Sequence, residues 1–318
     1  MERFIIVGGS GFVGQYVLQN LRKIYPESSI VNLDIVMPKE SFGSQYYFCD
    51  LTREFDFNFF PEDIVIHLAA RQYHPKPSRE KREEYFFELN FYGTQRLVEK
   101  MERDNCRRMI YFSTDMVYGL PQHIPLRSSH IRRPFGAYGK SKLASEKMLQ
   151  NLWNQGFKVT IFRPRMIVGR GRFGLLTKLF WLMKHNLPIP MIGNGKNCYQ
   201  MVSVEDCAEA VICAIKKDIP NRCFNLGSKN PPMVKDLLAK LIRDVNSKSI
   251  VLPTCGICIK YILKVLGYIG IELMFEEQYE IADVEYIVDI AETINDLEWN
   301  PKYSDEQMLY QAYMEYMS

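Results

Sequence analysis

The sequence predicts an α/β protein, with a Rossmann-type doubly wound parallel sheet and a smaller C-terminal substrate-binding lobe. Three observations predict this fold class. Short apolar stretches alternate with helix-like stretches through the first half of the chain. Gly8, Gly11 and Gly14 stand at three-residue intervals after the first apolar stretch, and Asp34 ends the second. A strand, a glycine-rich turn, a helix, a strand and an acid in this order indicate a dinucleotide-binding domain.

Length and composition fit an ordinary globular protein. The 318 residues suffice for one large domain, or for a domain and a smaller lobe, with a sizeable core. The net charge of +3 is too small to indicate nucleic-acid binding. The chain enters its first strand without a charged and apolar leader, so we expect a cytoplasmic protein.

The longest apolar stretch, residues 250–275, is not expected to be an integral membrane segment. Two lysines and a glutamate interrupt it, so it lacks the roughly 20 clean apolar residues of a membrane span. A helix lying on a membrane surface remains an alternative, although a helix packed on the protein core is favoured.

The eight cysteines are scattered through the sequence. Cys255 and Cys258 have the spacing of a metal or redox motif, but no second pair and no nearby histidine accompany them. We therefore expect reduced, structural cysteines and no metal site.

The first strand, residues 3–7, leads into the glycine-rich turn, and a helix-like stretch then runs to Tyr25. Such a turn brings the backbone close to a pyrophosphate, and the helix N-terminus supplies amide donors and a positive dipole end. The residues of this turn that we assign to a cofactor are Gly8, Ser10, Gly11, Phe12, Val13 and Gly14.

The second strand, residues 29–33, ends in Asp34, twenty residues after the last glycine of the turn. A carboxylate there accepts hydrogen bonds from both ribose hydroxyls and repels a 2′-phosphate, which favours NAD over NADP. Asp50 and Leu51 follow the next strand, residues 45–49. Asp50 is either an adenine contact or a helix N-cap, and its sequence context does not decide between the two.

At the end of the fourth strand, residues 63–68, the sequence His67-Leu68-Ala69-Ala70 offers small residues that let the backbone pass close to a cofactor. A charged, proline-broken region of 71–84 comes next. It reads as a solvated loop, yet Arg71, Tyr73 and His74 follow a strand's carboxyl end, where ligands bind in open α/β sheets.

The stretch with the most chemistry runs from 112 to 142. Ser113 and Thr114 end the fifth strand, residues 109–112, and Tyr138 and Lys142 stand four apart at the start of a helix of 138–156. Residues four apart share a helix face, so the ammonium is expected beside the phenol, where it favours the phenolate and makes the tyrosine a general base.

Two further elements complete the expected sheet region. A helix of 85–104 carries Asn90, and a strand of 159–162 leads to Arg163 and Pro164. All the features named above then fall on one edge of the sheet.

The pattern loosens in the second half of the chain. Residues 1–165 are predicted to form the nucleotide-binding domain, with 205–227 returning to it, and residues 166–204 and 228–318 are predicted to form a lobe over the sheet's edge. The expected elements are helices at 175–185, 205–216, 237–245 and 259–266, an extended stretch at 199–204 and a strand at 223–226.

These residues together resemble the extended short-chain dehydrogenase/reductases, the epimerase and dehydratase group, along essentially the whole chain. The matching motifs are Gly8-x-x-Gly11-x-x-Gly14, Asp34, Asp50-Leu51, His67-Leu68-Ala69-Ala70, Asn90 with Gly93-Thr94, Ser113-Thr114 ahead of Val117-Tyr118-Gly119, Tyr138-x-x-x-Lys142 and Arg163-Pro164.

The resemblance implies roles for matching residues. Tyr138 would be the acid/base for a substrate hydroxyl, and Lys142 would bind the nicotinamide ribose and lower the tyrosine's pKa. Thr114, or Ser113 beside it, would hydrogen-bond the same substrate oxygen. NAD would be the cofactor, with Asn90 and Pro164 also at its site.

Departures from the family pattern concern the substrate. The resemblance implies an acid pair after the threonine in 4,6-dehydratases, but this chain has Asp115 and Met116, which disfavours dehydration. Met166 stands where many relatives have an asparagine that contacts the substrate diphosphate. Tyr199 stands where relatives often have an arginine that binds the nucleotide. Replacement anion sites, or simply surface residues, are Arg165, Arg170, Arg172 and Lys196. The residues assigned to the substrate are Arg71, Tyr73, His74, Asp115, Met116, Met166, Arg172 and Tyr199.

Three functions remain open. The favoured one is an NAD-dependent sugar-nucleotide 4-epimerase with a nucleotide-diphosphate sugar as substrate. The second is an NAD-dependent alcohol dehydrogenase or ketone reductase of the 3β-hydroxysteroid type, acting on a lipid-like substrate. The third, a non-catalytic NAD-binding regulator, is disfavoured because Tyr138 and Lys142 are both present. The resemblance also implies a homodimer formed by the helices of Asn90 and Tyr138.

Overall fold

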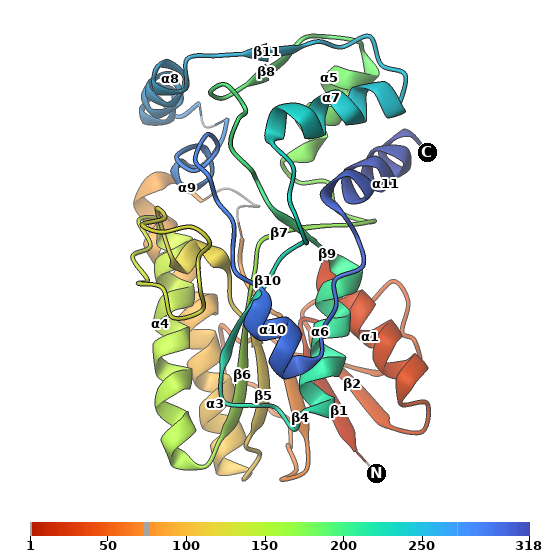
Figure 1. Ribbon diagram of the computed structural model, residues 1–318. Coiled ribbons are helices and arrows are strands. Elements are labelled where there is room, and N and C mark those ends of the chain that lie inside the picture. Colours follow the sequence, from red (N-terminus) through yellow and green to blue (C-terminus); the bar gives the residue numbers. More distant parts are fainter. Residues whose placement is uncertain (1, 73–76, 272) are drawn as a thin grey trace.

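The computed structural model describes residues 2–72, 77–271 and 273–318. Seven strands of these residues form one sheet in the order β10-β6-β5-β4-β1-β2-β3, and every pairing in it is parallel. The chain starts in the interior of the sheet and winds outward in both directions, with helices on both faces (Figure 1). The predicted doubly wound α/β fold is therefore confirmed.

The observed strands agree closely with the ranges expected from the sequence. Each of the central strands carries a nearly continuous apolar run, because helices cover both faces of a parallel sheet. The strands of the sheet are β1 (Arg3–Val7), β2 (Ser29–Asp34), β3 (Gln45–Phe48), β4 (Ile64–His67), β5 (Arg108–Phe112), β6 (Lys158–Pro164) and β10 (Cys223–Leu226).

Alternate residues of the strands fill two cores. Phe4 and Ile6 of β1 pack into the core that includes buried residues of helices α1 (Phe12–Ile24) and α6 (Val204–Lys216). Ile5 and Val7 point the other way, into the core that includes buried residues of α3 (Thr94–Arg103) and α4 (Ala137–Leu152). The glycine-rich turn that leads into α1 and the helix that carries Tyr138 are thus attached to opposite faces of the same strands.

One predicted helix is interrupted. The expected helix of 85–104 consists of α2 (Arg82–Phe87), a π-helical turn (Glu88–Gly93) and α3. Asn90 lies in the wide turn, a form that often marks a functional position. The end of the expected 71–84 loop is helical too, because α2 begins at Arg82.

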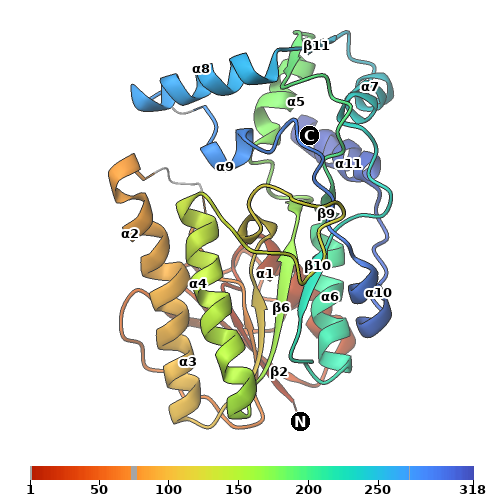
Figure 2. The same cartoon turned by 60° about the vertical axis from the view of Figure 1, so that its left-hand side comes forward.

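The second half of the chain forms smaller elements over the carboxyl ends of the strands (Figure 2). The sequence predicted three of the helices among them, at 175–185, 237–245 and 259–266, and the extended stretch at 199–204, but not the other short strands or the last three helices. These elements are β7 (Met166–Val168) paired with β9 (Met201–Ser203), β8 (Ile189–Met191) paired with β11 (Val251–Pro253), α5 (Leu176–Lys184), α7 (Val234–Asp244), α8 (Gly256–Tyr268), α9 (Glu276–Tyr279) and α11 (Asp305–Met317). Helix α10 (Ala291–Leu297) lies instead beside the sheet, where it contacts β10 and α6 (Figure 1). The division into two domains at the predicted boundaries stays a prediction.

Two further expectations concern α8 and the cysteines. None of the helices in the described ranges is long and apolar enough to cross a membrane. All eight cysteines are described and carry free thiols, as expected, but Cys255 and Cys258 are exposed. The structural role expected for these two cysteines stays a prediction.

Candidate active site

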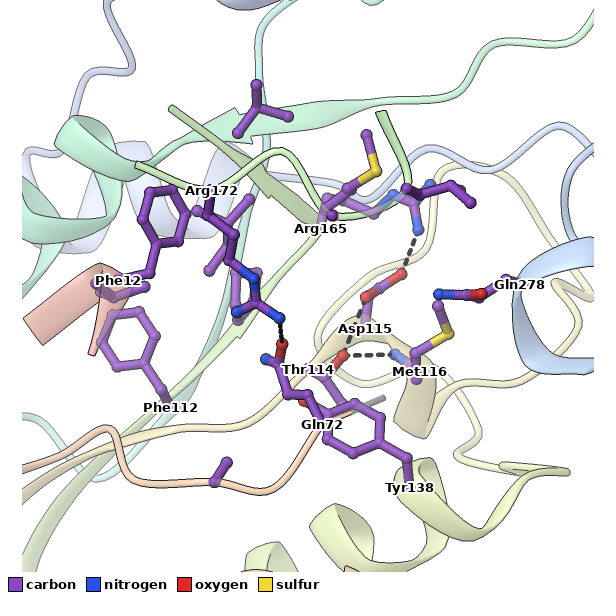
Figure 3. Close-up of a pocket in the computed structure, with 18 of the residues that line it drawn as sticks. Phe12, Gln72, Phe112, Thr114, Asp115, Met116, Tyr138, Arg165, Arg172 and Gln278 are labelled. Carbon is purple, nitrogen blue, oxygen red and sulfur yellow. Dashed lines mark hydrogen bonds and ion pairs between the residues drawn. The ribbon is translucent and has the colours of Figure 1, made fainter. Parts of the chain in front are cut away.

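A cavity of about 220 Å³ lies where the carboxyl edge of the sheet meets the second half of the chain (Figure 3). Parallel strands bring their carboxyl ends to one edge, so side chains far apart in sequence meet there. Besides the predicted residues, Gln72, Phe112, Arg165 and Gln278 line it. The predicted residues that line it are Phe12, Val13, Leu68, Ala70, Ser113, Thr114, Asp115, Met116, Tyr138, Lys142, Pro164, Met166, Arg172 and Tyr199.

Other predicted residues do not line this cavity. Tyr73 and His74 lie outside the described residues, and nothing further is concluded for them. Arg71 points elsewhere: its guanidinium forms an ion pair with Glu88 and donates to the Tyr85 carbonyl at 3.0 Å. The predicted site residues that are described but do not line the cavity are Gly8, Ser10, Gly11, Gly14, Asp34, Asp50, Leu51, Ala69, Arg71 and Asn90.

The glycine turn between β1 and α1 admits no side chains at two positions. Gly8 has a φ of +89°, and a Cβ there would stand 2.6 Å from the Ala69 nitrogen. A Cβ on Gly14 would stand 2.4 Å from the Gly8 carbonyl oxygen. No side chain caps the N-terminus of α1. The turn therefore presents bare backbone and helix amides, which suits a pyrophosphate.

Asp34 is oriented by the same turn. Its Oδ2 accepts a hydrogen bond from the Ser10 amide at 2.9 Å, and its Oδ1 accepts one from the Val36 amide at 3.1 Å. A carboxylate has about four lone-pair positions, so both oxygens retain capacity for a ribose diol.

Asp50 is held by its own turn. It accepts hydrogen bonds from the Thr52 amide at 2.9 Å and the Thr52 hydroxyl at 2.7 Å. The residues after it form a turn rather than a helix, so the helix N-cap alternative is wrong. Its side chain is 28% exposed, and the adenine contact stays a prediction.

Asn90 ties the end of β4 to α4. Its Oδ1 accepts from the Arg71 amide at 2.8 Å, and its Nδ2 donates to the Arg71 carbonyl at 3.1 Å and to the Ser141 hydroxyl at 3.1 Å. These bonds use the amide's donors and one acceptor position. Asn90 therefore fixes the strand end relative to the helix that carries Tyr138.

Tyr138 and Lys142 are buried, with 5% and 2% of their surface exposed. Burial, followed by the nearby Asp115 carboxylate, raises the pKa of Tyr138 above its usual value. The ammonium of Lys142 lies 4.3 Å from the Tyr111 ring centroid. Burial lowers the pKa of Lys142 to about 7, against the opposing effect of Glu146.

With only the protein's own charges present, the expectation that Lys142 lowers the pKa of Tyr138 is therefore wrong. Desolvation of the phenolate outweighs the neighbouring cations, and Lys142 itself is only partly protonated at neutral pH. Gln72 and Arg172 lower the tyrosine's pKa instead.

We expect the substitution Lys142→Met to make protein stability less dependent on pH. The pKa of Lys142 falls from 10.5 to about 7 on folding, so the unfolded chain binds more protons between these values. The stability linked to this lysine is therefore fully present above pH 10.5 and is lost as the pH falls to 7. Urea unfolding should find the variant more stable than the wild-type protein at pH 6 by about 2 kcal/mol, with the gap closing toward pH 10. If the two proteins differed equally in unfolding free energy at pH 6 and at pH 10, the lowered pKa of Lys142 would be contradicted.

Thr114 begins a short helical turn that sets the cavity floor. Its hydroxyl accepts from the Met116 amide at 3.2 Å and donates to Asp115 Oδ1 at 3.2 Å. The other carboxylate oxygen of Asp115 forms an ion pair with Arg165 Nη1. Both oxygens of Asp115 are thus engaged within the protein.

Arg165 lines the cavity, whereas the sequence left open whether it is an anion site or a surface residue. It is 2% exposed, and its guanidinium carbon lies 4.6 Å from the Tyr199 ring centroid and 4.2 Å from the Tyr286 ring centroid. Burial alone would lower its pKa, but Asp115 and the two tyrosines raise it, so it stays charged. Its Nε and Nη2 have no hydrogen-bond partner among the described residues. These buried donors are available to oxygens of a ligand.

The other proposed cations are distributed differently. Arg172 lines the cavity and donates from Nη2 to Gln72 Oε1 at 2.6 Å. Arg170 and Lys196 are not among the described residues that line it. Only two of the four cations proposed as anion sites therefore meet at the cavity.

A buried ion pair holds the catalytic helix in place. Glu146 lies on the α4 face of Tyr138 and Lys142, one turn further on, and accepts from Arg163 Nε at 2.9 Å and Nη2 at 2.8 Å. Arg132 also donates to Glu146, at 2.8 Å. The sequence flagged Arg163 through its motif, but not its partner, because 17 residues and a change of element separate them.

Comparisons with known proteins agree with this geometry. Residues 4–227 match the model of the NAD dependent epimerase/dehydratase family. The chain is 30% identical over 269 residues to human dTDP-D-glucose 4,6-dehydratase, covering 78% of this chain and 76% of that protein. It is 26% identical over 290 residues to an Escherichia coli O157:H7 N-acetyl-alpha-D-glucosaminyl-diphospho-ditrans,octacis-undecaprenol 4-epimerase, covering 84% and 81%. A crystal structure of UDP-galactose 4-epimerase superposes with a TM-score of 0.75 at 17% identity, covering 99% of this chain and 98% of that one.

Proposed function

Since this chain belongs to the NAD dependent epimerase/dehydratase family, we propose that it is a 4-epimerase of a sugar diphosphate, most simply a nucleotide sugar. The family includes enzymes that invert and enzymes that dehydrate, as the names of this chain's relatives illustrate. The observation that carries the choice is the pair Asp115 and Met116. Asp115 is engaged by Thr114 and Arg165, and its neighbour has no acidic group.

The residues at the sheet edge fit NAD as the cofactor. The bare backbone around Gly8 and Gly14 suits the pyrophosphate, and the spare lone pairs of Asp34 suit the adenosine ribose. Lys142, buried next to the cavity, would bind the second ribose. When bound, NAD supplies reversible oxidation at a carbinol carbon.

Tyr138 would move the proton in this reaction. Its phenol takes the proton from the sugar's C4 hydroxyl and returns it to the same oxygen when the other epimer forms. Thr114 would fix that oxygen by a hydrogen bond. Because the pKa of Tyr138 is raised in the protein alone, a neighbouring positive charge has to offset the desolvation when the phenolate forms. Lys142 and the cation of the oxidised cofactor are the candidates.

Dehydration of a sugar needs a base and an acid that these residues do not provide. Removing water from a sugar ring requires a base for the proton next to the ketone and an acid for the departing hydroxyl. A thioether at position 116 cannot act as the base. The carboxylate of Asp115 is bound to a buried guanidinium. To act as the acid it would first have to take up a proton, which would leave the charge of Arg165 unpaired in the interior.

Arg165 would bind the polar part of the substrate. Its guanidinium, with Nε and Nη2 unpartnered among the described residues, forms a neutral pair with the Asp115 carboxylate next to two aromatic rings. Such a pair offers donors to sugar oxygens without imposing a net charge on the pocket. Arg172 then serves the diphosphate from the open side of the cavity.

The proposal also covers assembly and location. We expect a homodimer through the outer faces of α3 and α4, where Tyr92 in the preceding turn is 49% exposed, and a cytoplasmic enzyme. Sedimentation velocity at several protein concentrations tests the dimer, and fractionation of cells tests the location.

The experiment that tests the function is incubation with UDP-, dTDP-, GDP- and CDP-sugars and NAD, followed by NMR of the sugar protons. The proposal expects a new epimer and no net NADH. Stoichiometric NADH would instead indicate the alcohol dehydrogenase, and a deoxy-keto sugar would indicate a dehydratase. Either result would refute the 4-epimerase.

For Asp34→Ala we expect the dissociation constant for NAD to rise about tenfold or more, because hydrogen bonds to a charged acceptor are lost. Binding of NADP should not weaken, since the repelling carboxylate is removed. Titration calorimetry with both cofactors measures the effect. Asp56→Ala, an exposed acid on a loop, is the matched control and should bind NAD as the wild-type protein does. Equal losses for NAD and NADP would argue against the ribose assignment.

A further inference from the structure

The outer side of helix α8 is apolar and exposed. Ile257, Tyr261, Val265 and Tyr268 are 83%, 68%, 42% and 64% exposed, and their spacing puts them in one line along the helix. We define these four residues, with the exposed Ile262 and Ile269 beside them, as the α8 face. No residue of α8 is fully buried. A surface helix of a globular protein normally turns such a stripe inward.

The attachment of α8 explains why its apolar side faces out. Lys260, on the inner side, donates to the Glu280 carbonyl at 2.8 Å and forms an ion pair with Asp283 Oδ1 at 2.6 Å. A charged residue therefore anchors the helix to the protein, while the isoleucines and tyrosines point away. Figure 2 shows α8 extending beyond the body of the protein, above α2.

The charges on α8 and beside its outer face are mainly positive, with Glu276 of α9 as an acid in the same small pocket as Arg79 and Lys264. From 245 to 271 the sequence has three lysines and no acidic residue. Lys264 is exposed on α8, and the Arg79 guanidinium lies 4.1 Å from the Tyr268 ring centroid. The acids nearest to Arg79 in sequence are Glu80 on its own segment and Glu83 and Glu84 on α2. None of them belongs to α8.

This charge pattern distinguishes two possible occupants. If two copies of the chain paired through their α8 faces, Lys264 of each copy would approach cations of the other, with no acid on α8 to balance them. An anionic lipid surface, by contrast, offers phosphates to the lysine and arginine and an acyl boundary to the isoleucines. Tyrosines, apolar with one polar end, suit the same boundary.

We propose that α8 docks this protein on the surface of a membrane containing anionic phospholipid, with the helix lying in the plane of the interface. The helix has 13 residues, about 20 Å at 1.5 Å per residue, which is too short to span a bilayer. The apolar stripe enters the acyl boundary, and the lysine and arginine remain at the level of the headgroups.

Docking would bring the active site close to the lipid. Helix α9 contacts α8, and Gln278 of α9 lines the cavity. A membrane-bound protein therefore holds its cavity one short helix away from the surface, within reach of a sugar diphosphate carried on a lipid. The docking itself rests on the α8 face and not on the proposed reaction.

Flotation of the full-length protein with vesicles tests the proposal without substrate or cofactor. The vesicles are phosphatidylcholine alone, or phosphatidylcholine with phosphatidylglycerol. The wild-type protein should float with the anionic vesicles, and the double variant Ile257→Glu/Tyr261→Glu should reduce the bound fraction about tenfold or more. Added salt should weaken the binding only in part, because the apolar contribution remains.

The matched control is Leu120→Glu/Ile131→Glu, which places two acids at positions that are 52% and 53% exposed elsewhere on the surface. It should float as the wild-type protein does, and circular dichroism should show both variants folded. Wild-type protein that stays unbound with both kinds of vesicle would overturn the proposal. So would an α8 variant that dissociates a dimer in sedimentation while vesicle binding is absent or unchanged.

Discussion

Tyr138→Phe should lower kcat about 10³-fold and leave the fold and NAD binding nearly unchanged. The substitution removes one hydroxyl, the group that we propose exchanges a proton with the substrate. The ring stays in place against Phe86, whose centroid is 5.7 Å away. Initial rates of epimer formation by NMR or by a coupled assay measure the loss, and calorimetry measures the dissociation constant for NAD.

Tyr310→Phe is the matched control, because this tyrosine is 38% exposed on α11, far along the chain from the site. It should retain wild-type activity. If Tyr138→Phe keeps more than about a tenth of the wild-type kcat, Tyr138 is not the acid/base. If it is inactive but also fails to bind NAD, the loss does not report proton transfer.

Glu146→Ala should lower the free energy of unfolding by about 3–5 kcal/mol. The substitution leaves Arg163, which is 1% exposed, with its charge uncompensated in the interior. The remaining contacts of Arg163, the Tyr118 hydroxyl at 2.9 Å and the Ser128 carbonyl at 2.6 Å, are neutral. Equilibrium unfolding in urea measures the change.

A double-substitution cycle separates the ion pair from simple packing loss. Glu146→Met/Arg163→Met removes both charges and fills the space, so it should recover much of the lost stability. Glu99→Ala, at an exposed acid of α3, is the control and should change stability by less than about 0.5 kcal/mol. A Glu146→Ala protein as stable as the control would show that the pair does not hold α4.

Much of the fold follows from local sequence. Apolar runs and the glycine turn predict the parallel sheet because buried strands and a cofactor turn have local signatures. The order of its motifs also identified the family, which the match over residues 4–227 confirms. Of the small strand pairs near 166–203 and 189–253, only the extended stretch at 199–204 was predicted, since three-residue strands carry too few residues for a periodic pattern.

The site was predictable where it depends on motifs and not where it depends on tertiary contacts. Tyr138, Lys142 and Thr114 come together at the cavity as their motifs indicate. The direction of the Tyr138 pKa shift was wrong, because burial is a property of the assembled fold. The engagement of Asp115 by Arg165 spans 50 residues and has no local signature.

The central claim is that the reaction returns hydrogen to the carbon from which it came, with inverted configuration. The most direct measurement uses a sugar diphosphate that the enzyme accepts, labelled with deuterium at C4, and locates the label by NMR. The account predicts deuterium at C4 of the new epimer and no net NADH. Deuterium in a C6 methyl group, or its loss with stoichiometric NADH, would contradict the account.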